Sequence, residues 1–222
     1  TNFAANNLPG ALSVIAIAEK NNLFHAPETY MEKISTKVSE KGVIDLDYSV
    51  KENIFNLCEY LNKKPQSITA CIMDRPRHKE IIDELNILGV KIKLITDGDV
   101  SGALLVTDDK YGVDIFLGIG GGPEGVLASA ALDTFECSFQ GRFLFHTEED
   151  KRRANKMGIT NLSKKYELDE IVKGDSIFCA TGITTGDLVS GIITENNKFI
   201  TETLVTHKST GLKKIIKKVV NR

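Results

Sequence analysis

The segment GIGGGPEG, residues 118–125, constrains the fold of this chain more than any other. It follows the strand-like run VDIFL at 113–117, and it combines five glycines with Glu124. Glycine has no Cβ, so backbone N–H groups in such a segment can approach an anion closely. A carboxylate would repel a bare phosphate unless a divalent cation lay between them. The pattern therefore favours a metal-bridged phosphate site in a loop between strand and helix. A tight turn with a solvated Glu124 is the alternative.

Two nucleotide-binding motifs do not fit this segment. The dinucleotide fingerprint GxGxxG matches Gly118 and Gly120, but Pro123 occupies the position of its third glycine. A P-loop needs Gly-Lys-Ser/Thr after its glycines, and no lysine follows them here. A Rossmann-type nucleotide binder is therefore disfavoured.

Composition excludes several classes of partner. The chain has 222 residues and a formal net charge of −2, which argues against broad binding to nucleic acid or to anionic membranes. No apolar run approaches the ~20 residues of a membrane-spanning helix. The sequence contains no CxxC pair, so we expect buried free thiols and a cytoplasmic location for its four cysteines, Cys58, Cys71, Cys137 and Cys179.

The apolar patterns predict an α/β fold. Residues 68–74, 79–88 and 90–95 read as strand, helix and strand, which predicts a right-handed parallel crossover. The polar loops after both strands, and the glycine segment, should then meet at one edge of the sheet. Further expected elements are buried strands at 11–18 and 176–181, helices at 123–135 and 150–158, and a closing hairpin or meander formed by 199–206 and 213–220. We expect one unit over residues 1–222, with a possible sub-lobe at 160–222.

The loop after residue 74 carries two arginines around a proline, in the order Arg75-Pro76-Arg77. Guanidinium groups present a planar fork of donors that matches phosphate oxygens. Surface pairing with an acid such as Glu80 is an equally weighted alternative. The next residue, His78, could donate to a phosphate, but we expect it to cap the following helix or to be exposed to solvent.

The next loop, Asp97-Gly98-Asp99, places two carboxylates around a glycine. Such a pair could bind sugar hydroxyls, ligate a hard cation or cap a helix. We expect Asp99 to cap the helix that follows, which leaves Asp97 free to contact a ligand.

These segments together resemble the class II fructose-1,6-bisphosphatases, including the dual fructose-1,6/sedoheptulose-1,7-bisphosphatases. The resemblance runs in order along essentially the whole chain. The matching motifs are His25-Ala26-Pro27, Tyr30-Met31-Glu32-Lys33, Asp74-Arg75-Pro76-Arg77-His78, Asp97-Gly98-Asp99-Val100, the glycine segment with Val126, Met157-Gly158-Ile159, Ala180-Thr181-Gly182-Ile183-Thr184 and Gly186-Asp187-Leu188.

The resemblance implies a layered α/β sugar-phosphatase fold, of the inositol monophosphatase/fructose bisphosphatase type, without its N-terminal part. It implies release of the 1-phosphate of fructose 1,6-bisphosphate in gluconeogenesis, dependent on Mn²⁺ or Mg²⁺, by a homo-oligomer. Glu124 would be a metal ligand, and Thr1 would help to position the attacking water. The implied substrate contacts are Tyr30, Arg75, Pro76, Arg77, Asp97, Gly98, Asp99 and Gly121.

Family members carry roughly ninety further residues before the position of Thr1, and those residues hold the other acidic metal ligands. The chain opens with Thr1 close to the expected strand at 11–18, so we expect an upstream piece of the natural protein to be absent. We therefore expect the 222-residue chain to be inactive alone, with exposed apolar surface. The alternative function is a non-catalytic module that binds sugar phosphates.

Overall fold

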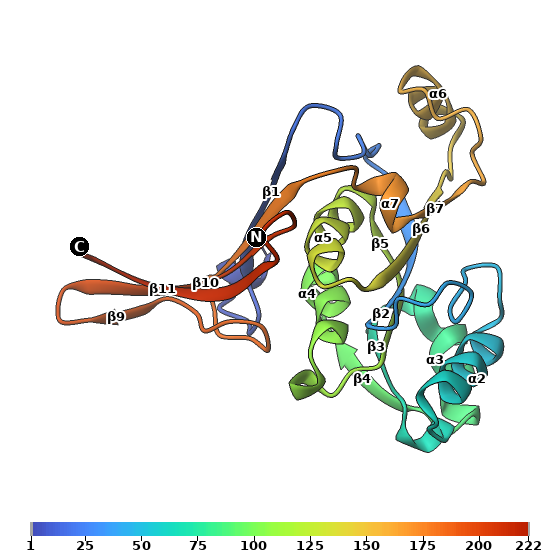
Figure 1. Cartoon of the computed structure of the whole chain (residues 1–222), viewed down its shortest axis with the longest axis horizontal. Coiled ribbons are helices and arrows are strands. Elements are labelled where there is room, and N and C mark those ends of the chain that lie inside the picture. The colour runs from blue at the N-terminus through green and yellow to red at the C-terminus, as the bar shows by residue number, and fades with distance from the viewer. Residues whose placement is uncertain (1, 222) are drawn as a thin grey trace.

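The structure, a computed structural model, describes residues 2–221, whose strands form two β-sheets (Figure 1). One sheet has six strands in the order β4–β3–β5–β2–β6–β7. The other has the order β1–β8–β10–β11, with β9 paired to β10. The strands are β1 (Leu12–Ala18), β2 (Tyr30–Thr36), β3 (Thr69–Met73), β4 (Lys91–Ile95), β5 (Ile115–Gly121), β6 (Ser138–Leu144), β7 (Lys165–Glu167), β8 (Ser176–Gly182), β9 (Ile193–Glu195), β10 (Lys198–His207) and β11 (Leu212–Asn221).

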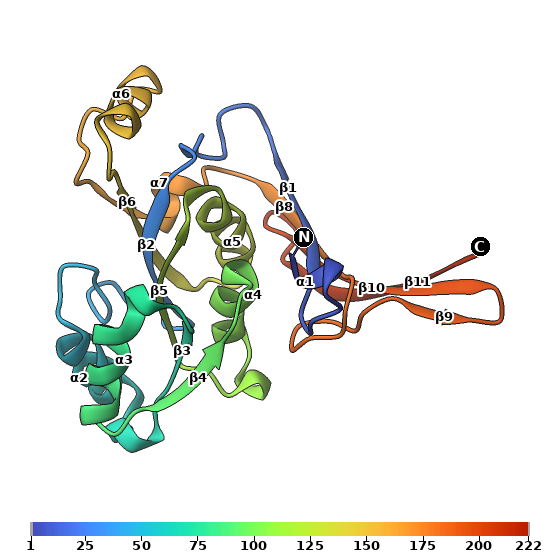
Figure 2. The ribbon, with the colours of Figure 1, turned by 180° about the vertical axis from the view of Figure 1, so that it is seen from behind.

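Helices and sheets alternate in layers, which confirms the predicted layered α/β fold. Helices α4 and α5 lie between the two sheets, and α2 and α3 cover the other face of the six-stranded sheet (Figures 1 and 2). The α-helices are α1 (Asn2–Ala5), α2 (Val50–Leu61), α3 (Lys79–Ile87), α4 (Asp99–Leu104), α5 (Gly122–Thr134), α6 (Glu148–Lys156) and α7 (Leu168–Ile171). The 3₁₀ helices are η1 (Pro65–Ser67), η2 (Pro76–His78), η3 (Leu105–Thr107) and η4 (Asp109–Tyr111).

The predicted strand–helix–strand unit is present as β3, α3 and β4. Strand β3 runs parallel to both β4 and β5, so the three strands end at one edge of the sheet. The loops after β3 and β4, and the start of α5 after β5, therefore meet there. The predicted closing hairpin is also confirmed, because β10 and β11 pair antiparallel over their whole lengths.

The glycine segment is not a loop, which corrects the first expectation. Strand β5 continues through Gly118 and Gly120 to Gly121, paired with β2, and α5 begins at the next residue. None of these glycines has a positive φ, so backbone strain does not explain them. Lack of space explains two of them, because a Cβ on Gly120 or Gly121 would overlap a carboxylate of the neighbouring cavity.

Strand β1 is present where predicted, but it is not buried. Ile15 and Ile17 are each 53% exposed, and only the alternate residues of the strand face α5. A continuous apolar run is typical of a strand covered on both faces. Here the outer face of the five-stranded sheet has no covering layer among the described residues (Figure 2). The expected exposed apolar surface is therefore found on this strand.

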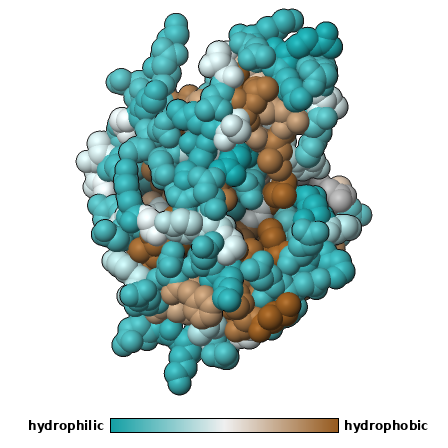
Figure 3. Space-filling model, turned by 90° about the vertical axis from the view of Figure 1, so that its right-hand side faces the viewer, coloured by the Kyte–Doolittle hydropathy of each residue, from teal (hydrophilic) through white to brown (hydrophobic). Residues whose placement is uncertain are grey.

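The side of the molecule formed by α2, α3 and α6 is largely hydrophilic, with separate apolar patches (Figure 3). No helix within residues 2–221 combines the length and the apolarity needed to cross a membrane. The cysteines are free, and Cys58, Cys71 and Cys137 are buried as predicted, whereas Cys179 is half-buried. Burial raises the pKa of the Cys71 and Cys137 thiols to about 12, so neither is a ready nucleophile.

Candidate functional site

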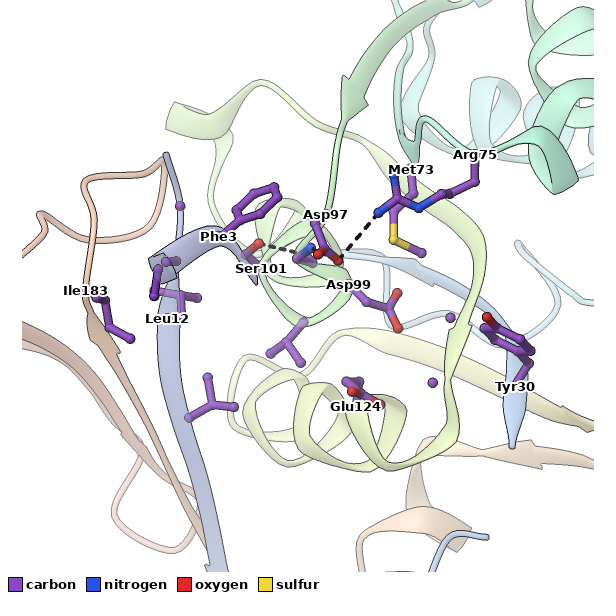
Figure 4. Close-up of a pocket in the computed structure, with 18 of the residues that line it drawn as sticks. Phe3, Leu12, Tyr30, Met73, Arg75, Asp97, Asp99, Ser101, Glu124 and Ile183 are labelled. Atoms are coloured by element: carbon purple, nitrogen blue, oxygen red, sulfur yellow. Dashed lines mark hydrogen bonds and ion pairs between the residues drawn. The ribbon is translucent and has the colours of Figure 1, made fainter. Parts of the chain in front are cut away.

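A cavity of about 450 Å³ opens where the ends of β3, β4 and β5 face the start of β1 (Figure 4). Nearly all of the predicted site residues within 2–221 line it, and Pro76 is the exception. Thr1 lies outside the described residues. The lining residues that the sequence had singled out are Tyr30, Arg75, Arg77, Asp97, Gly98, Asp99, Gly121 and Glu124.

The two arginines are held in different ways. Arg77 donates from Nε to the carbonyl of Ile119 at 2.9 Å, and its guanidinium carbon lies 5.1 Å from the centroid of the Tyr30 ring. These two contacts orient the guanidinium through its Nε–H and its planar face, and they do not use its terminal nitrogens. Arg75 Nη2 lies 4.0 Å from Asp97 Oδ1, and this ion pair is exposed and therefore weak. These contacts differ from the pairing with Glu80 that was the alternative.

His78 occupies the N-cap position of α3, but its side chain makes no capping hydrogen bond and does not face solvent, which corrects that expectation. Its ring is fully buried, and Nδ1 lies 2.7 Å from the Met73 carbonyl. Nε2 accepts the backbone N–H of Ile119 at 2.8 Å, so Nδ1 must carry the proton that is donated to Met73. The imidazole thereby ties the end of β3 to the glycine-rich half of β5, beyond the last paired residues of these strands, Cys71 and Phe116.

The neutral His78 predicts that stability falls with acidity. Burial lowers the pKa of His78 below its usual value of 6.5, so the unfolded chain binds this proton first. The contribution of neutral His78 to the free energy of unfolding is complete above about pH 6.5. It is lost as the pH falls towards the folded-state pKa, with a slope of up to about 1.4 kcal/mol per pH unit. Urea unfolding between pH 5 and 7.5 should show that the free energy of unfolding falls less steeply with acidity for His78→Gln than for the wild type. Equal slopes for both proteins would contradict this assignment.

The Asp97-Gly98-Asp99 loop is shaped by its glycine. Gly98 has φ +89° and is itself the N-cap of α4, and Asp97 accepts the Gly98 N–H at 3.0 Å. The expectation that Asp99 caps α4 is wrong, because its side chain makes no capping hydrogen bond and is 8% exposed. Its carboxylate is used instead by a lysine from another strand.

That lysine is Lys33, a site residue that sequence reasoning missed. It lies in the middle of β2, is 1% exposed, and pairs with Asp99 through its ammonium group. The ammonium also donates to the Gly121 carbonyl at 2.6 Å. Burial lowers the pKa of Lys33 and raises the pKa of Asp99, whereas their mutual attraction opposes both shifts. Asp99 lines the cavity, and Lys33 lies behind it, outside the set of lining residues.

Glu124 lies in the first turn of α5 and enters the cavity beside Asp99 (Figure 4). Its carboxylate lies directly over Gly121, whose missing side chain makes room for it. No group of three or more His, Cys, Asp or Glu side chains within residues 2–221 is placed to hold a metal ion. Glu124 can therefore supply one oxygen ligand, but these residues alone do not form a complete metal site.

Comparison with known proteins shows the family to which this sequence is similar. A family model described as bacterial fructose-1,6-bisphosphatase, glpX-encoded, matches residues 1–220. A D-fructose 1,6-bisphosphatase class 2/sedoheptulose 1,7-bisphosphatase of Synechococcus sp. (strain JA-3-3Ab) is 37% identical over 218 residues, which are 92% of this chain and 63% of that protein. The protein of the same name from Prochlorococcus marinus (strain AS9601) is 35% identical over 219 residues, covering 92% of this chain and 66% of that protein.

A third relative of that name, from Microcystis aeruginosa (strain NIES-843 / IAM M-2473), is 37% identical over 205 residues, which cover 86% of this chain and 59% of that protein. The chain thus spans less than two thirds of the length of these relatives. The family model's match, residues 1–220, includes the elements that line the cavity. The chain belongs to the glpX-encoded, class II family of fructose-1,6-bisphosphatases.

Proposed function

We propose that the full-length protein hydrolyses the 1-phosphate of fructose 1,6-bisphosphate in central carbon metabolism, in the cytoplasm and as a homo-oligomer. The observation that carries the proposal is one cavity that combines oriented guanidinium groups with carboxylates. The family, and the printed names of the relatives, support a sugar bisphosphate as the substrate.

In this proposal, Arg75 and Arg77 hold a phosphate, and Asp97, Asp99 and Tyr30 orient the sugar. Gly98 and Gly121 offer backbone groups to it, and Pro76 keeps the two arginines at fixed spacing. Positioning of this kind is effective because phosphoryl transfer depends mainly on alignment and charge neutralisation. Glu124 contributes one ligand to Mn²⁺ or Mg²⁺, a hard cation that would neutralise phosphoryl charge. The other ligands, and the role proposed for Thr1, lie outside residues 2–221.

The test compares two lengths of the protein. The full-length protein should release phosphate from fructose 1,6-bisphosphate when manganese is present. The 222-residue chain should not do so measurably, because its described residues hold no complete metal site. A colorimetric phosphate assay with and without manganese measures both. Manganese-dependent turnover by the 222-residue chain would refute its inactivity, and an inactive full-length protein would refute the proposed reaction.

A second candidate function, a non-catalytic sugar-phosphate-binding module, is favoured by the same shortage of metal ligands within residues 2–221. It predicts affinity for fructose 6-phosphate without turnover, even in the full-length protein.

A further inference from the structure

Lys33 is a charged residue with no exposure to solvent, and the proposed reaction gives it no role. Lysine is almost never fully buried unless it is paired. Here the side chain reaches from β2 to the Asp99 carboxylate Oδ2 and to the Gly121 carbonyl, which belong to α4 and β5. One ammonium group thus joins β2, α4 and β5 directly behind two residues that line the cavity, Asp99 and Gly121.

The glycines around this pair provide the space that it occupies. A Cβ on Gly120 would overlap the Asp99 carboxylate, whereas a Cβ on Gly125 would meet Met31 Sδ at 2.5 Å before Lys33 Cε at 3.1 Å. The glycine at position 120 is therefore explained by the need to admit the buried carboxylate of this ion pair.

The second oxygen of Asp99 is left without a partner. Oδ1 is buried, and no hydrogen bond reaches it from residues 2–221. A buried acceptor without a donor costs about 1–3 kcal/mol, so such an atom calls for a partner, which a ligand group or a water can supply. The carboxylate points into the cavity, in the space bounded by Glu124, Arg75 and Tyr30 (Figure 4).

We propose that Lys33 is a positioning residue that determines specificity for sugar phosphates over inorganic phosphate. By holding Oδ2, it fixes the rotation of the Asp99 carboxylate so that Oδ1 accepts a hydroxyl group of the bound sugar. By holding the Gly121 carbonyl, it also fixes the end of β5 against the same ligand. The choice of sugar phosphate as ligand rests on the function proposed above.

Replacement of Lys33 by methionine removes the charge but nearly keeps the volume. Asp99 must then take up a proton or turn towards water, and in either case Oδ1 loses its fixed position. If Asp99 takes up a proton, one positive and one negative charge are lost together, so the net charge near Arg75 and Arg77 does not change. Affinity for inorganic phosphate, which has no hydroxyl for Oδ1, should therefore be nearly unaffected.

The experiment measures binding of fructose 6-phosphate and of inorganic phosphate to the 222-residue chain by titration calorimetry. Lys33→Met should weaken fructose 6-phosphate binding at least tenfold and phosphate binding less than threefold. The double variant Lys33→Met/Asp99→Asn should regain thermal stability, because the pair is then uncharged, but should not regain sugar affinity. That split separates positioning from a purely structural role.

Lys63→Met is the matched control. Lys63 pairs with Asp114 at 2.6 Å, at the opposite end of β5 from the cavity, so its loss should lower stability without changing either affinity. Equal losses for both ligands with Lys33→Met, or no loss, would overturn the proposal. So would a wild-type chain that binds fructose 6-phosphate no more tightly than phosphate. An inactive full-length protein would refute the proposed reaction but would not alter this ratio.

Discussion

Replacing Glu124 with glutamine should lower manganese-dependent phosphate release by the full-length protein at least about 100-fold. Loss of a group that hydrogen-bonds to a metal ligand typically costs 10–100-fold in metal affinity or activity, so loss of a direct carboxylate ligand should cost no less. Glutamine keeps the shape that lies over Gly121, and the fold should therefore persist. Steady-state rates across a manganese titration should show both a lower maximum and a weaker apparent affinity for the metal.

Glu80→Gln is the control for this variant. Glu80 is an exposed acid in the first turn of α3 and does not line the cavity, so its rate should equal that of the wild type. An unchanged rate for Glu124→Gln would refute the assignment of Glu124 as a ligand.

Gly120→Ala should destabilise the 222-residue chain by about 3–5 kcal/mol, the usual effect of breaking a buried ion pair. The new Cβ would overlap the Asp99 carboxylate. Displacement of that carboxylate would cost free energy, because it is buried and held by Lys33. Urea unfolding at pH 7 measures the change in the free energy of unfolding.

Gly118→Ala provides a matched control in the same strand, two residues earlier. Its nearest neighbour would be Nε2 of His78 at 3.6 Å, an ordinary van der Waals contact. We expect a change of about 1 kcal/mol or less, since alanine also restricts the unfolded chain. Equal destabilisation by the two substitutions would show that the space beside Gly120 does not depend on the ion pair.

The sequence predicted the part of the molecule in which local pattern and topology agree. Residues 68–95 alternate clearly between strand and helix, and parallel pairing then brings their loops to one edge. For this reason Arg75, Arg77, Asp97 and Glu124 were expected near one another, and they line one cavity.

Strand β2 was not predicted, although it lies inside the six-stranded sheet. Its buried residues include Lys33, Ser35 and Thr36, which do not form an apolar pattern. Their polar groups are satisfied by distant partners: Thr36 donates to the carbonyl of Asp114 at 2.8 Å, and Lys33 pairs with Asp99. Such partners are far away in sequence, so no local pattern reveals them. His78 was misjudged for the same reason.

The pairing of β1 with β8 also has a consequence for synthesis of the protein. Ile15 pairs with Cys179, about 160 residues later in the chain. At 5–20 residues per second, a ribosome needs roughly ten to thirty seconds to make that interval. Until then none of the other described strands pairs with the apolar strand β1, and it offers chaperones a binding segment. The five-stranded sheet must therefore assemble late, after the six-stranded sheet has most of its strands.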